Sequence, residues 1–370
     1  MTASSIDVAT LRDWLERGEP VTVLDVRPAA ERAEWAIPGS RHVDAYAALR
    51  AGDPGALAGA DLPAGPPVVT VCAAGRTAAL ATELLRARGV PALTLAGGMR
   101  AWGLAWNTAE VAPDDRAAAR VLQVRRTGKG CLSYLVGADG EAAVIDAAVE
   151  PEVYLDLAAA RGWRIVAVLD THVHADHLSR SRALAERAGA TLYLPATDRV
   201  AYPHVALRDG ETVAVGAARL AALHTPGHTA ESACYLLDGR LLLTGDTLFL
   251  EGVGRPDLAA DQAEARARAR ALHGSLRRLL ALAPATLVLP GHTGAPVPFD
   301  GRALVAPLGE VRAAVAALGL PEAAFVETIL ARLPPTPPNY HQIVALNESG
   351  LAPAADPLEL EAGANRCAVA

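Results

Sequence analysis

The stretch T-H-V-H-A-D-H at residues 171–177 places three histidines and one aspartate within seven positions. It follows the apolar run I-V-A-V-L-D, which predicts a buried strand, and it precedes a helical pattern. In an extended segment His172 and His174 can face one site, while Asp176 and His177 can face a neighbouring one. Metals need several imidazole and carboxylate donors converging on one point. The stretch therefore predicts a metal site at the carboxyl edge of a strand, where α/β proteins place their ligands.

Three further segments each place one donor just after an apolar strand and beside a glycine. They are H-T-P-G-H-T at 224–229 with His228, L-L-L-T-G-D-T at 241–247 with Asp246, and L-V-L-P-G-H-T at 287–293 with His292. A glycine at such a place lets backbone and ligand approach closely. Four matching segments in one order argue against a chance arrangement of surface histidines. The remaining histidines match no ligand position: His42, His204, His224, His273 and His341.

The order H-x-H-x-D-H, then His, Asp and His, resembles the metallo-β-lactamase superfamily over about residues 121–300. The resemblance implies an αββα sandwich, two sheets flanked by helices, with metal at the strand edge. By matching position it implies His172, His174 and His228 as first-site ligands, Asp176, His177 and His292 as second-site ligands, and Asp246 as a bridge.

Two chemistries share this scaffold, and the seven residues fit both. Two zinc ions would lower the pKa of a bound water to about 7, and the hydroxide would attack an ester, amide or thioester. One iron would instead use His172, His228 and Asp246 as a two-histidine, one-carboxylate face with open positions for O2 and substrate. The other four residues would then orient the ligands through hydrogen bonds.

The loop T-L-F-L-E-G-V-G-R-P-D-L at 247–258 resembles the corresponding segment of persulfide dioxygenases and hydroxyacylglutathione hydrolases. In those families a G-x-G-R stretch borders the thiol substrate. The resemblance makes Arg255 a candidate to pair bidentately with a substrate carboxylate. The alternative for Arg255 is a solvated surface position or a structural ion pair.

A second candidate site lies near the N-terminus. The apolar run at 68–71 leads directly into C-A-A-G-R-T-A at 72–78, after which a helical pattern begins. A cysteine at such a turn faces backbone N–H groups and the positive end of a helix dipole, which stabilise negative charge on sulfur. Arg76 adds positive charge, so Cys72 is the predicted nucleophile and the carrier of an anionic persulfide. The three other cysteines, Cys131, Cys234 and Cys367, are expected to be inert.

The N-terminal segment from about residue 6 to 106 resembles rhodanese (sulfurtransferase) domains. The Cys72 loop matches their active loop, L-D-V-R-P-A-A-E-R-A-E-W-A-I-P-G-S at 24–40 matches their D-V-R…I-P-G signature, and L-A-G-G-M-R-A-W at 95–102 matches their closing segment. Two positions depart from the family: Ala36 replaces the usual histidine, and the loop has arginine at its fifth position and threonine at its sixth. Alternating strands and helices here predict a parallel sheet covered on both faces.

The chain of 370 residues accommodates two domains. We expect a rhodanese-like α/β domain at 1–107, a linker at 108–120, and the αββα domain at 121–370. The proline-rich tail from Pro334 is predicted to pack on the surface rather than cap the metal pocket. The Asp238-Gly239 pair predicts a two-residue hairpin turn.

Charge and hydropathy exclude several partners. A net charge of −7 argues against nucleic-acid binding, which needs a basic face. No apolar run approaches the roughly 20 residues of a membrane helix, and no signal-peptide pattern is visible. We therefore expect a cytoplasmic protein without a membrane partner, and the sequence leaves a homo-oligomer open.

These features lead to one main functional hypothesis and two alternatives. The main one is an iron-dependent persulfide dioxygenase, with one Fe(II) per chain, that oxidises glutathione persulfide or a similar thiol persulfide with O2 to sulfite. Cys72 would exchange sulfane sulfur between thiosulfate and a thiol, in either direction. The first alternative is a thioesterase of the hydroxyacylglutathione hydrolase type with two zinc ions. The second is that the N-terminal domain only binds or docks.

Overall fold

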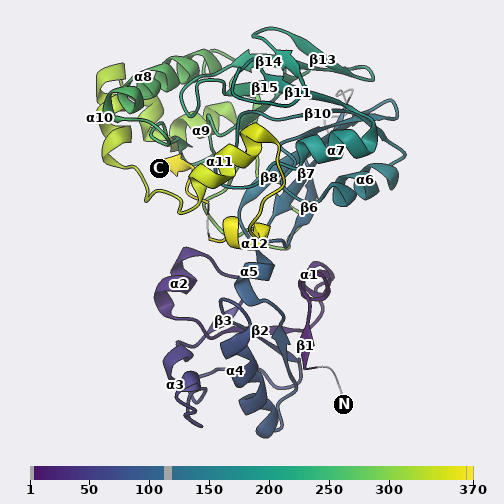
Figure 1. Cartoon of the computed structure of the whole chain (residues 1–370), viewed down its shortest axis with the longest axis vertical. Helices are drawn as coiled ribbons and strands as arrows, with labels where there is room; N and C mark the ends of the chain where they lie inside the picture. The colour runs from purple at the N-terminus through teal and green to yellow at the C-terminus, as the bar shows by residue number, and fades with distance from the viewer. Residues whose placement is uncertain (1–3, 112–118, 364, 370) are drawn as a thin grey trace.

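The computed structural model describes residues 4–111, 119–363 and 365–369. The chain forms a smaller N-terminal domain and a larger C-terminal domain stacked along the longest axis of the molecule (Figure 1). Within the described residues, no helix combines the length and apolar character that crossing a membrane requires.

The N-terminal domain is built on a five-stranded parallel sheet with the order β1-β5-β4-β2-β3. Its strands are β1 (Ser5–Ile6), β2 (Thr22–Asp25), β3 (Arg41–His42), β4 (Val68–Val71) and β5 (Ala92–Leu95). Its helices are α1 (Val8–Glu16), α2 (Ala29–Glu34), α3 (Tyr46–Arg50), α4 (Arg76–Ala87) and α5 (Gly98–Trp102).

Both faces of this sheet are covered because its strands are apolar on both sides. In β4 successive side chains point to opposite faces. Val68 packs with Leu24 and the α4 residue Ala81 in one core, whereas Val69 packs with Leu11 of α1 in a second core. The predicted parallel sheet with helices on both faces is confirmed.

The C-terminal domain contains two larger sheets. The first has the order β12-β11-β10-β9-β8-β7-β6, and the second has the order β13-β14-β15-β16-β18-β19. The strands of the first are β6 (Asn107–Glu110), β7 (Arg120–Arg126), β8 (Cys131–Ala138), β9 (Glu141–Ile145), β10 (Arg164–Leu169), β11 (Thr191–Pro195) and β12 (Val205–Leu207). Those of the second are β13 (Thr212–Val215), β14 (Ala218–His224), β15 (Ala233–Leu237), β16 (Leu241–Gly245), β18 (Leu287–Pro290) and β19 (Ala306–Pro307).

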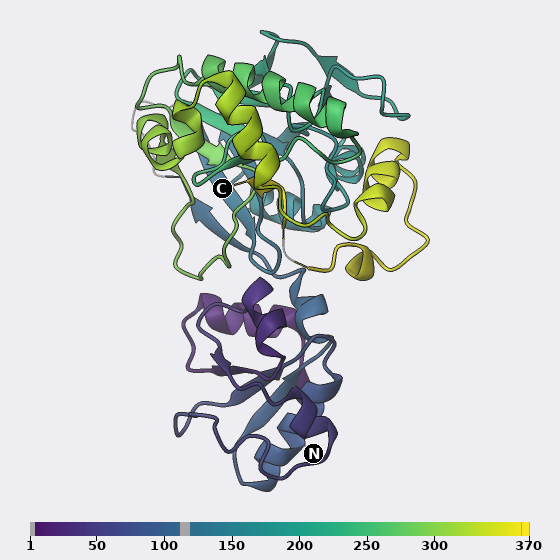
Figure 2. The ribbon, with the colours of Figure 1, turned by 90° about the vertical axis from the view of Figure 1, so that its left-hand side faces the viewer.

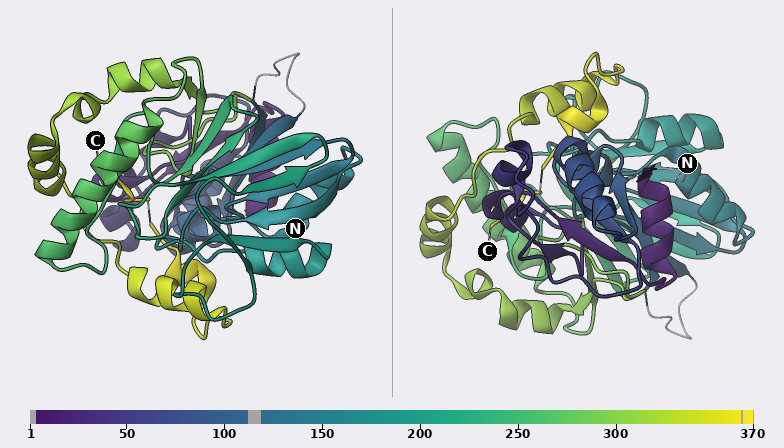
Figure 3. Two further views of the ribbon diagram at one scale, coloured as in Figure 1. Left: turned by 90° about the horizontal axis from the view of Figure 1, so that it is seen from above. Right: turned by 90° about the horizontal axis from the view of Figure 1, so that it is seen from below.

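The two sheets pack face to face, and helices cover their outer faces (Figure 3). The core between the sheets joins residues such as Tyr134 and Leu169 to Tyr235 and Leu243. The first sheet is covered by α6 (Pro151–Ala159) and α7 (Ser181–Ala188). The second is covered by α8 (Gln262–Leu279), α9 (Leu308–Ala314), η1 (Ala316–Gly319) and α10 (Glu322–Ala331). The expected αββα sandwich is therefore confirmed.

Two local expectations need correction. Strand β6 (Asn107–Glu110) covers the start of the expected linker at 108–120, pairs antiparallel with β7 and extends the first large sheet. The part of that linker at 112–118 lies outside the described residues. The hairpin connection has three residues rather than two, because Leu237 pairs with Leu241 across Asp238, Gly239 and Arg240.

The tail from Pro334 is structured and lies beside both domains. It forms α11 (Tyr340–Ser349), α12 (Pro357–Leu360) and β20 (Ala368–Val369), and β20 pairs with β17 (Val253–Gly254). Figure 2 shows this yellow segment descending along the larger domain to the boundary with the smaller one. We call residues 356–363 and 365–369 the C-terminal strap.

The domain boundary is held by direct contacts of the first domain with the β7–β8 turn. The indole Nε1 of Trp35 donates to the carbonyl of Thr127 at 3.1 Å. The Nε of Arg126 donates to the carbonyl of Gly103 at 2.7 Å. A Cβ on Gly128 would lie 1.8 Å from the carbonyl oxygen of Trp102, so this close approach requires glycine.

Glu361 of the strap is the charged centre of the boundary. Its carboxylate accepts from Arg126 Nη2 at 2.6 Å, from the backbone N–H of Leu178 at 2.8 Å, and from Arg180. The side chains of Glu361 and Arg126 are each 1% exposed. Burial alone would raise the pKa of Glu361, but the two arginines outweigh it and lower the pKa to about 2.

We predict that Glu361→Gln lowers the free energy of unfolding by about 3 kcal/mol at pH 7, because it leaves Arg126 and Arg180 buried without their counter-charge. The carboxylate contributes fully above its ordinary pKa of 4.5, and its contribution is lost as pH falls toward 2. The measurement is urea unfolding of the variant and the parent chain over a range of pH. The difference between their free energies of unfolding should shrink as the pH falls below about 5.

The matched control is Glu359→Gln, two positions earlier, whose carboxylate is 52% exposed and pairs with the exposed Arg100. It should change stability by less than about 1 kcal/mol. Equal decreases in the free energy of unfolding of the two variants would contradict the anchoring role of Glu361.

Candidate metal centre

The predicted donors converge because several strands end at one edge of the sandwich. Strands β16 and β18 run parallel with Leu243 opposite Leu289, so Asp246 and His292 leave the second sheet side by side. His172 leaves the facing sheet at the end of β10. Gly245 has a φ of +47°, and a Cβ there would lie 2.4 Å from Thr171 Oγ1. Only glycine therefore allows the two sheet ends to meet.

His172, His228 and Asp246 form a first group. The Nε2 atoms of His172 and His228 lie 3.8 and 3.6 Å from Asp246 Oδ2. All three side chains are at most 2% exposed. His172 Nε2 and Asp246 Oδ2 are buried without a hydrogen-bond partner. Buried polar atoms without partners are costly, so this group has the donors and the spacing to hold one metal ion.

Neighbouring groups fix the orientation of both rings. His228 Nδ1 lies 2.8 Å from the backbone carbonyl of Arg255 and donates to it. His172 Nδ1 lies 2.9 Å from Thr171 Oγ1, and that hydroxyl donates to Asp146 Oδ2. Since each Nδ1 carries the proton, each Nε2 is left as a lone-pair donor directed at the group.

The electrostatics of the first group favour metal-binding protonation states. Burial lowers the pKa values of His172 and His228 below the ordinary value for histidine. Burial would raise the pKa of Asp246, but the neighbouring His292 outweighs it, and the net shift is downward. Neutral imidazoles beside a carboxylate are the forms that coordinate a metal.

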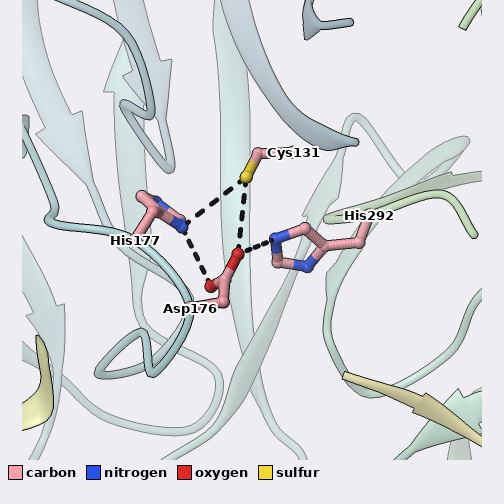
Figure 4. Close-up of side chains that lie close together, drawn as sticks. All are labelled: Cys131, Asp176, His177 and His292. Carbon is pink, nitrogen blue, oxygen red and sulfur yellow. Dashed lines mark hydrogen bonds and ion pairs between the residues drawn. The ribbon is translucent and has the colours of Figure 1, made fainter. Parts of the chain in front are cut away.

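A second group consists of Cys131, Asp176, His177 and His292 (Figure 4). Cys131 Sγ lies 3.4 Å from Asp176 Oδ2 and 3.8 Å from His177 Nδ1. His292 Nε2 lies 3.1 Å from Asp176 Oδ2, while His292 Nδ1 lies 2.5 Å from Asp246 Oδ1. The two groups are thus joined through His292 and Asp246.

Cys131 was expected to be inert, and the sequence holds no signal for its position here. It is the first residue of β8, and it forms an isolated bridge with His292. Burial and Asp176 raise the pKa of its thiol, but His177 and His292 outweigh them and lower it to about 6. Cys131 is buried, as expected, but it lies in a group of candidate metal donors, whereas Cys234 packs in a core with Leu242 and Leu279.

His174 belongs to a third group. Its Nε2 lies 3.3 Å from Asp146 Oδ1 and 3.9 Å from Asp170 Oδ1. The ring centroid of His174 is 4.3 Å from that of His172. The structure thus brings six of the seven expected donors into two linked groups and turns Nε2 of His174 toward two further carboxylates.

The tail also reaches the site, so the expectation that it merely packs on the surface is wrong. Asn347 of α11 donates to the carbonyls of His174 and His177 at 2.8 and 2.9 Å. Asn365 of the strap donates to Asp176 Oδ2 at 2.9 Å. Cys367 places its sulfur within 4.8 Å of donor atoms of Asp246 and His292. No local pattern in a proline-rich tail could indicate these long-range contacts.

Arg255 forms a structural ion pair, which was the alternative to pairing with a substrate carboxylate. Its side chain is 1% exposed and pairs with Asp257 through Nε–Oδ1 and Nη2–Oδ2 contacts of 2.8 Å each. Its Nη1 donates to the carbonyls of Pro335 and Arg366 at 3.1 Å. Arg255 therefore holds the loop and the tail together, while its own carbonyl orients His228.

Cys72 lies at the end of β4, as expected. Its sulfur accepts from the backbone N–H of Ala78 at 3.3 Å, in the first turn of α4. Its carbonyl accepts from the N–H of Met99 at 2.9 Å. Gly75 has a φ of +84° and Gly98 leaves no room for a Cβ beside Cys72. Arg76 is exposed at the start of α4. The loop thus turns the sulfur of Cys72 toward the backbone N–H of Ala78.

The remaining histidines stay outside these groups. Four of them contact backbone carbonyls through one ring nitrogen: His42, His204, His224 and His273. The ring of His341 lies 3.9 Å from that of Tyr340, centroid to centroid. The residue groups found suitable for a metal among the described residues include none of these five.

Two family models match the chain. Residues 126–292 match the metallo-beta-lactamase superfamily, and residues 7–105 match the rhodanese-like domain. A hydroxyacylglutathione hydrolase from Anaeromyxobacter dehalogenans is 39% identical over 202 residues, which cover 52% of this chain and 76% of that protein. A hydroxyacylglutathione hydrolase from Rhizobium johnstonii is 37% identical over 158 residues, which cover 41% of this chain and 57% of that protein.

Two solved structures share the fold of most of the chain. ETHE1 from Myxococcus xanthus superposes with a TM-score of 0.54 and 32% identity, covering 62% of this chain and 97% of that one. A metallo-beta-lactamase from Staphylococcus aureus subsp. aureus COL superposes with a TM-score of 0.57 and 26% identity, covering 64% of this chain and 74% of that one.

We predict that His228→Asn lowers the metal bound per chain at least about tenfold, because it removes one of three donors and its link to Arg255. The measurement is elemental analysis of protein loaded with iron(II) and then desalted. His224→Asn is the control, since this exposed ring contacts the backbone carbonyl of Ala230 and belongs to none of the candidate metal groups among the described residues. Unchanged metal in His228→Asn would remove this residue from the centre.

Proposed function

The chain belongs to the metallo-β-lactamase superfamily and carries a rhodanese-like domain, and on this premise we propose that it is an iron-dependent persulfide dioxygenase joined to a sulfurtransferase. The substrate is glutathione persulfide or a similar small thiol persulfide. In the balanced reaction RSSH, O2 and H2O give RSH, sulfite and two protons. The outer sulfur is oxidised, O2 is reduced, and the thiol is released.

The observation that carries the proposal is the pair of buried atoms without hydrogen-bond partners in the first group. His172 Nε2 and Asp246 Oδ2 face one another in a buried space, with His228 Nε2 3.6 Å from the same oxygen. His172, His228 and Asp246 would hold an iron(II) ion, which would supply open positions for O2 and a sulfur anion. His228 is held for this by the carbonyl of Arg255, and His172 by Thr171 and Asp146.

We propose that the second group holds no metal ion of its own, although its residues are also spaced to hold one. Asp176 Oδ2 already accepts from Asn365 and lies within hydrogen-bond range of Cys131. His292 Nδ1 lies 2.5 Å from Asp246 Oδ1, and its Nε2 lies 3.1 Å from Asp176 Oδ2 but makes no hydrogen bond within the described part of the chain. His174, which a second metal arrangement would need at the first site, faces Asp146 and Asp170. These residues therefore orient the first group through hydrogen bonds.

The comparisons support this proposal in part. ETHE1 is matched over 97% of its length, whereas the two hydrolases are matched over 76% and 57% of theirs. The hydrolase names favour the alternative, a thioesterase with two zinc ions, and all seven donors it needs are present. The number of metal ions bound per chain and the substrate that is consumed distinguish the dioxygenase from the thioesterase.

Cys72 supplies the transferase half of the proposal. A thiosulfate sulfane sulfur is attacked by the Cys72 thiolate, which forms an S–S bond and releases sulfite. A thiol then attacks the outer sulfur of that persulfide and releases Cys72 as thiolate. The N–H of Ala78 and the first turn of α4 stabilise the anionic sulfur in both steps.

We predict about one iron per chain after anaerobic loading, and O2 consumption that depends on added glutathione persulfide, with sulfite as product. The readouts are elemental analysis, an oxygen electrode and sulfite detection on one sample. Two zinc ions per chain, no O2 consumption and hydrolysis of a glutathione thioester would instead establish the thioesterase.

We predict that Cys72→Ser abolishes sulfur transfer from thiosulfate and leaves persulfide-dependent O2 consumption within about twofold of the parent, since serine cannot form a persulfide. The reciprocal variant His228→Asn should lose O2 consumption and keep transfer. Transfer that survives in Cys72→Ser would leave the N-terminal domain as a docking module.

A further inference from the structure

We propose that Asn347 of α11 and the buried ion pair of Glu231 with Arg199 are positioning residues of the metal centre, and that metal binding and the docking of α11 stabilise each other. They act on the loop at 170–180, which carries candidate donors from both groups. Every residue of this loop is described, and none belongs to a helix or strand. Its backbone groups therefore need hydrogen-bond partners from other segments. The proposal rests on the metal centre of the proposed function and adds the residues that hold its loop.

The amide of Asn347 bonds to three backbone groups of this loop. Its Nδ2 donates to the carbonyls of His174 and His177 at 2.8 and 2.9 Å, and its Oδ1 accepts from the N–H of Ser179 at 2.9 Å. An asparagine amide has two N–H donors and one carbonyl oxygen, so both donors and the oxygen are engaged here. The side chain is buried. Asn347 thus fixes the backbone on both sides of Asp176.

Glu231 holds the same loop at the residue between His172 and His174. Its Oε1 accepts from the N–H of Val173 at 3.1 Å, and its side chain is 3% exposed. A carboxylate at this depth needs a counter-charge. Arg199 provides it, because its Nη1 lies 2.8 and 2.9 Å from the two carboxylate oxygens. The ion pair therefore keeps a charged acceptor in place beside the backbone of the first group.

Arg199 also joins this pair to α11. Its Nε donates at 2.8 Å to Glu348, the residue after Asn347. The backbone carbonyl of Glu348 accepts from the N–H of Ala201 at 2.8 Å. Helix α11 therefore reaches the metal-binding loop through two adjacent residues, directly through Asn347 and by way of Arg199 through Glu348.

Metal binding and helix docking share this loop, so each stabilises the other. When His172 is held by a metal, the loop presents its backbone partners to Asn347 in a fixed arrangement. By thermodynamic linkage, the factor by which docking of α11 strengthens metal binding equals the factor by which the metal strengthens docking. Replacing a side chain that orients metal ligands through hydrogen bonds changes metal affinity by about 10- to 100-fold.

The first test measures Co(II) binding to the full-length chain by chelator competition, with the visible spectrum of bound Co(II) as a report on ligand geometry. Asn347→Ala should raise the dissociation constant at least about tenfold and alter the spectrum, because the loop loses three backbone hydrogen bonds. Gln342→Ala is the matched control, an exposed amide on the same helix, and it should leave both readouts unchanged.

Glu231 gives a second pair of variants. Glu231→Ala should weaken Co(II) binding about tenfold. Glu231→Gln keeps an amide oxygen that can accept from the N–H of Val173, so it should stay within about threefold of the parent chain. Thermal unfolding of the metal-free variants is measured alongside. A merely structural role would lower the unfolding temperature but leave the dissociation constant and the spectrum of the folded chain unchanged.

Hydrogen exchange tests the linkage in the opposite direction. Co(II) should slow amide exchange in α11 of the parent chain, and this protection should be lost in Asn347→Ala. Unchanged Co(II) binding in both Asn347→Ala and Glu231→Ala, or exchange in α11 that does not respond to Co(II), would overturn the proposal. A parent chain that binds no Co(II) would instead refute the metal centre on which the proposed function rests.

Discussion

The structure depends on the convergence of apolar strands at one sheet edge, where buried donors face one another without protein partners. Each of these strands ends in a glycine-containing turn that delivers His228, Asp246 or His292 to the same place. Leaving His172 Nε2 and Asp246 Oδ2 buried and unpaired costs free energy that a bound metal offsets. The large core between the two sheets holds this arrangement rigid.

A second constraint is the buried charge of the strap. Glu361 connects Arg126 of β7, which reaches the first domain through Gly103, with the loop that follows His177. One carboxylate therefore links the domain boundary to the metal-binding loop. This explains how a terminal segment with little regular structure has a fixed path past both sites.

Prediction from the sequence succeeded where a feature depends on residues that are close together in the chain. The strands follow from apolar runs, the αββα layers follow from the resemblance of the donor motifs to the metallo-β-lactamase superfamily, and Cys72 was placed correctly at the end of β4. It failed where a partner lies far along the chain. Asn365 meets Asp176 across 189 residues, and Cys131 joins His177 across 46. Neither pairing leaves a periodicity or a spacing that a single sequence reveals.

The sequence by itself indicated the two fold classes, the candidate donors and the candidate nucleophile, because motifs, strand patterns and turn glycines act over a few neighbouring residues. Only the tertiary structure decided how the donors divide: His172, His228 and Asp246 as one group, Cys131 in a second, and His174 turned to Asp146 and Asp170. It also decided that Arg255 is an internal ion pair and that the tail caps the site. These outcomes depend on which side chains meet when the sheets, the two domains and the tail pack together. Burial then sets how much free energy is lost for each polar atom that has no hydrogen-bond partner.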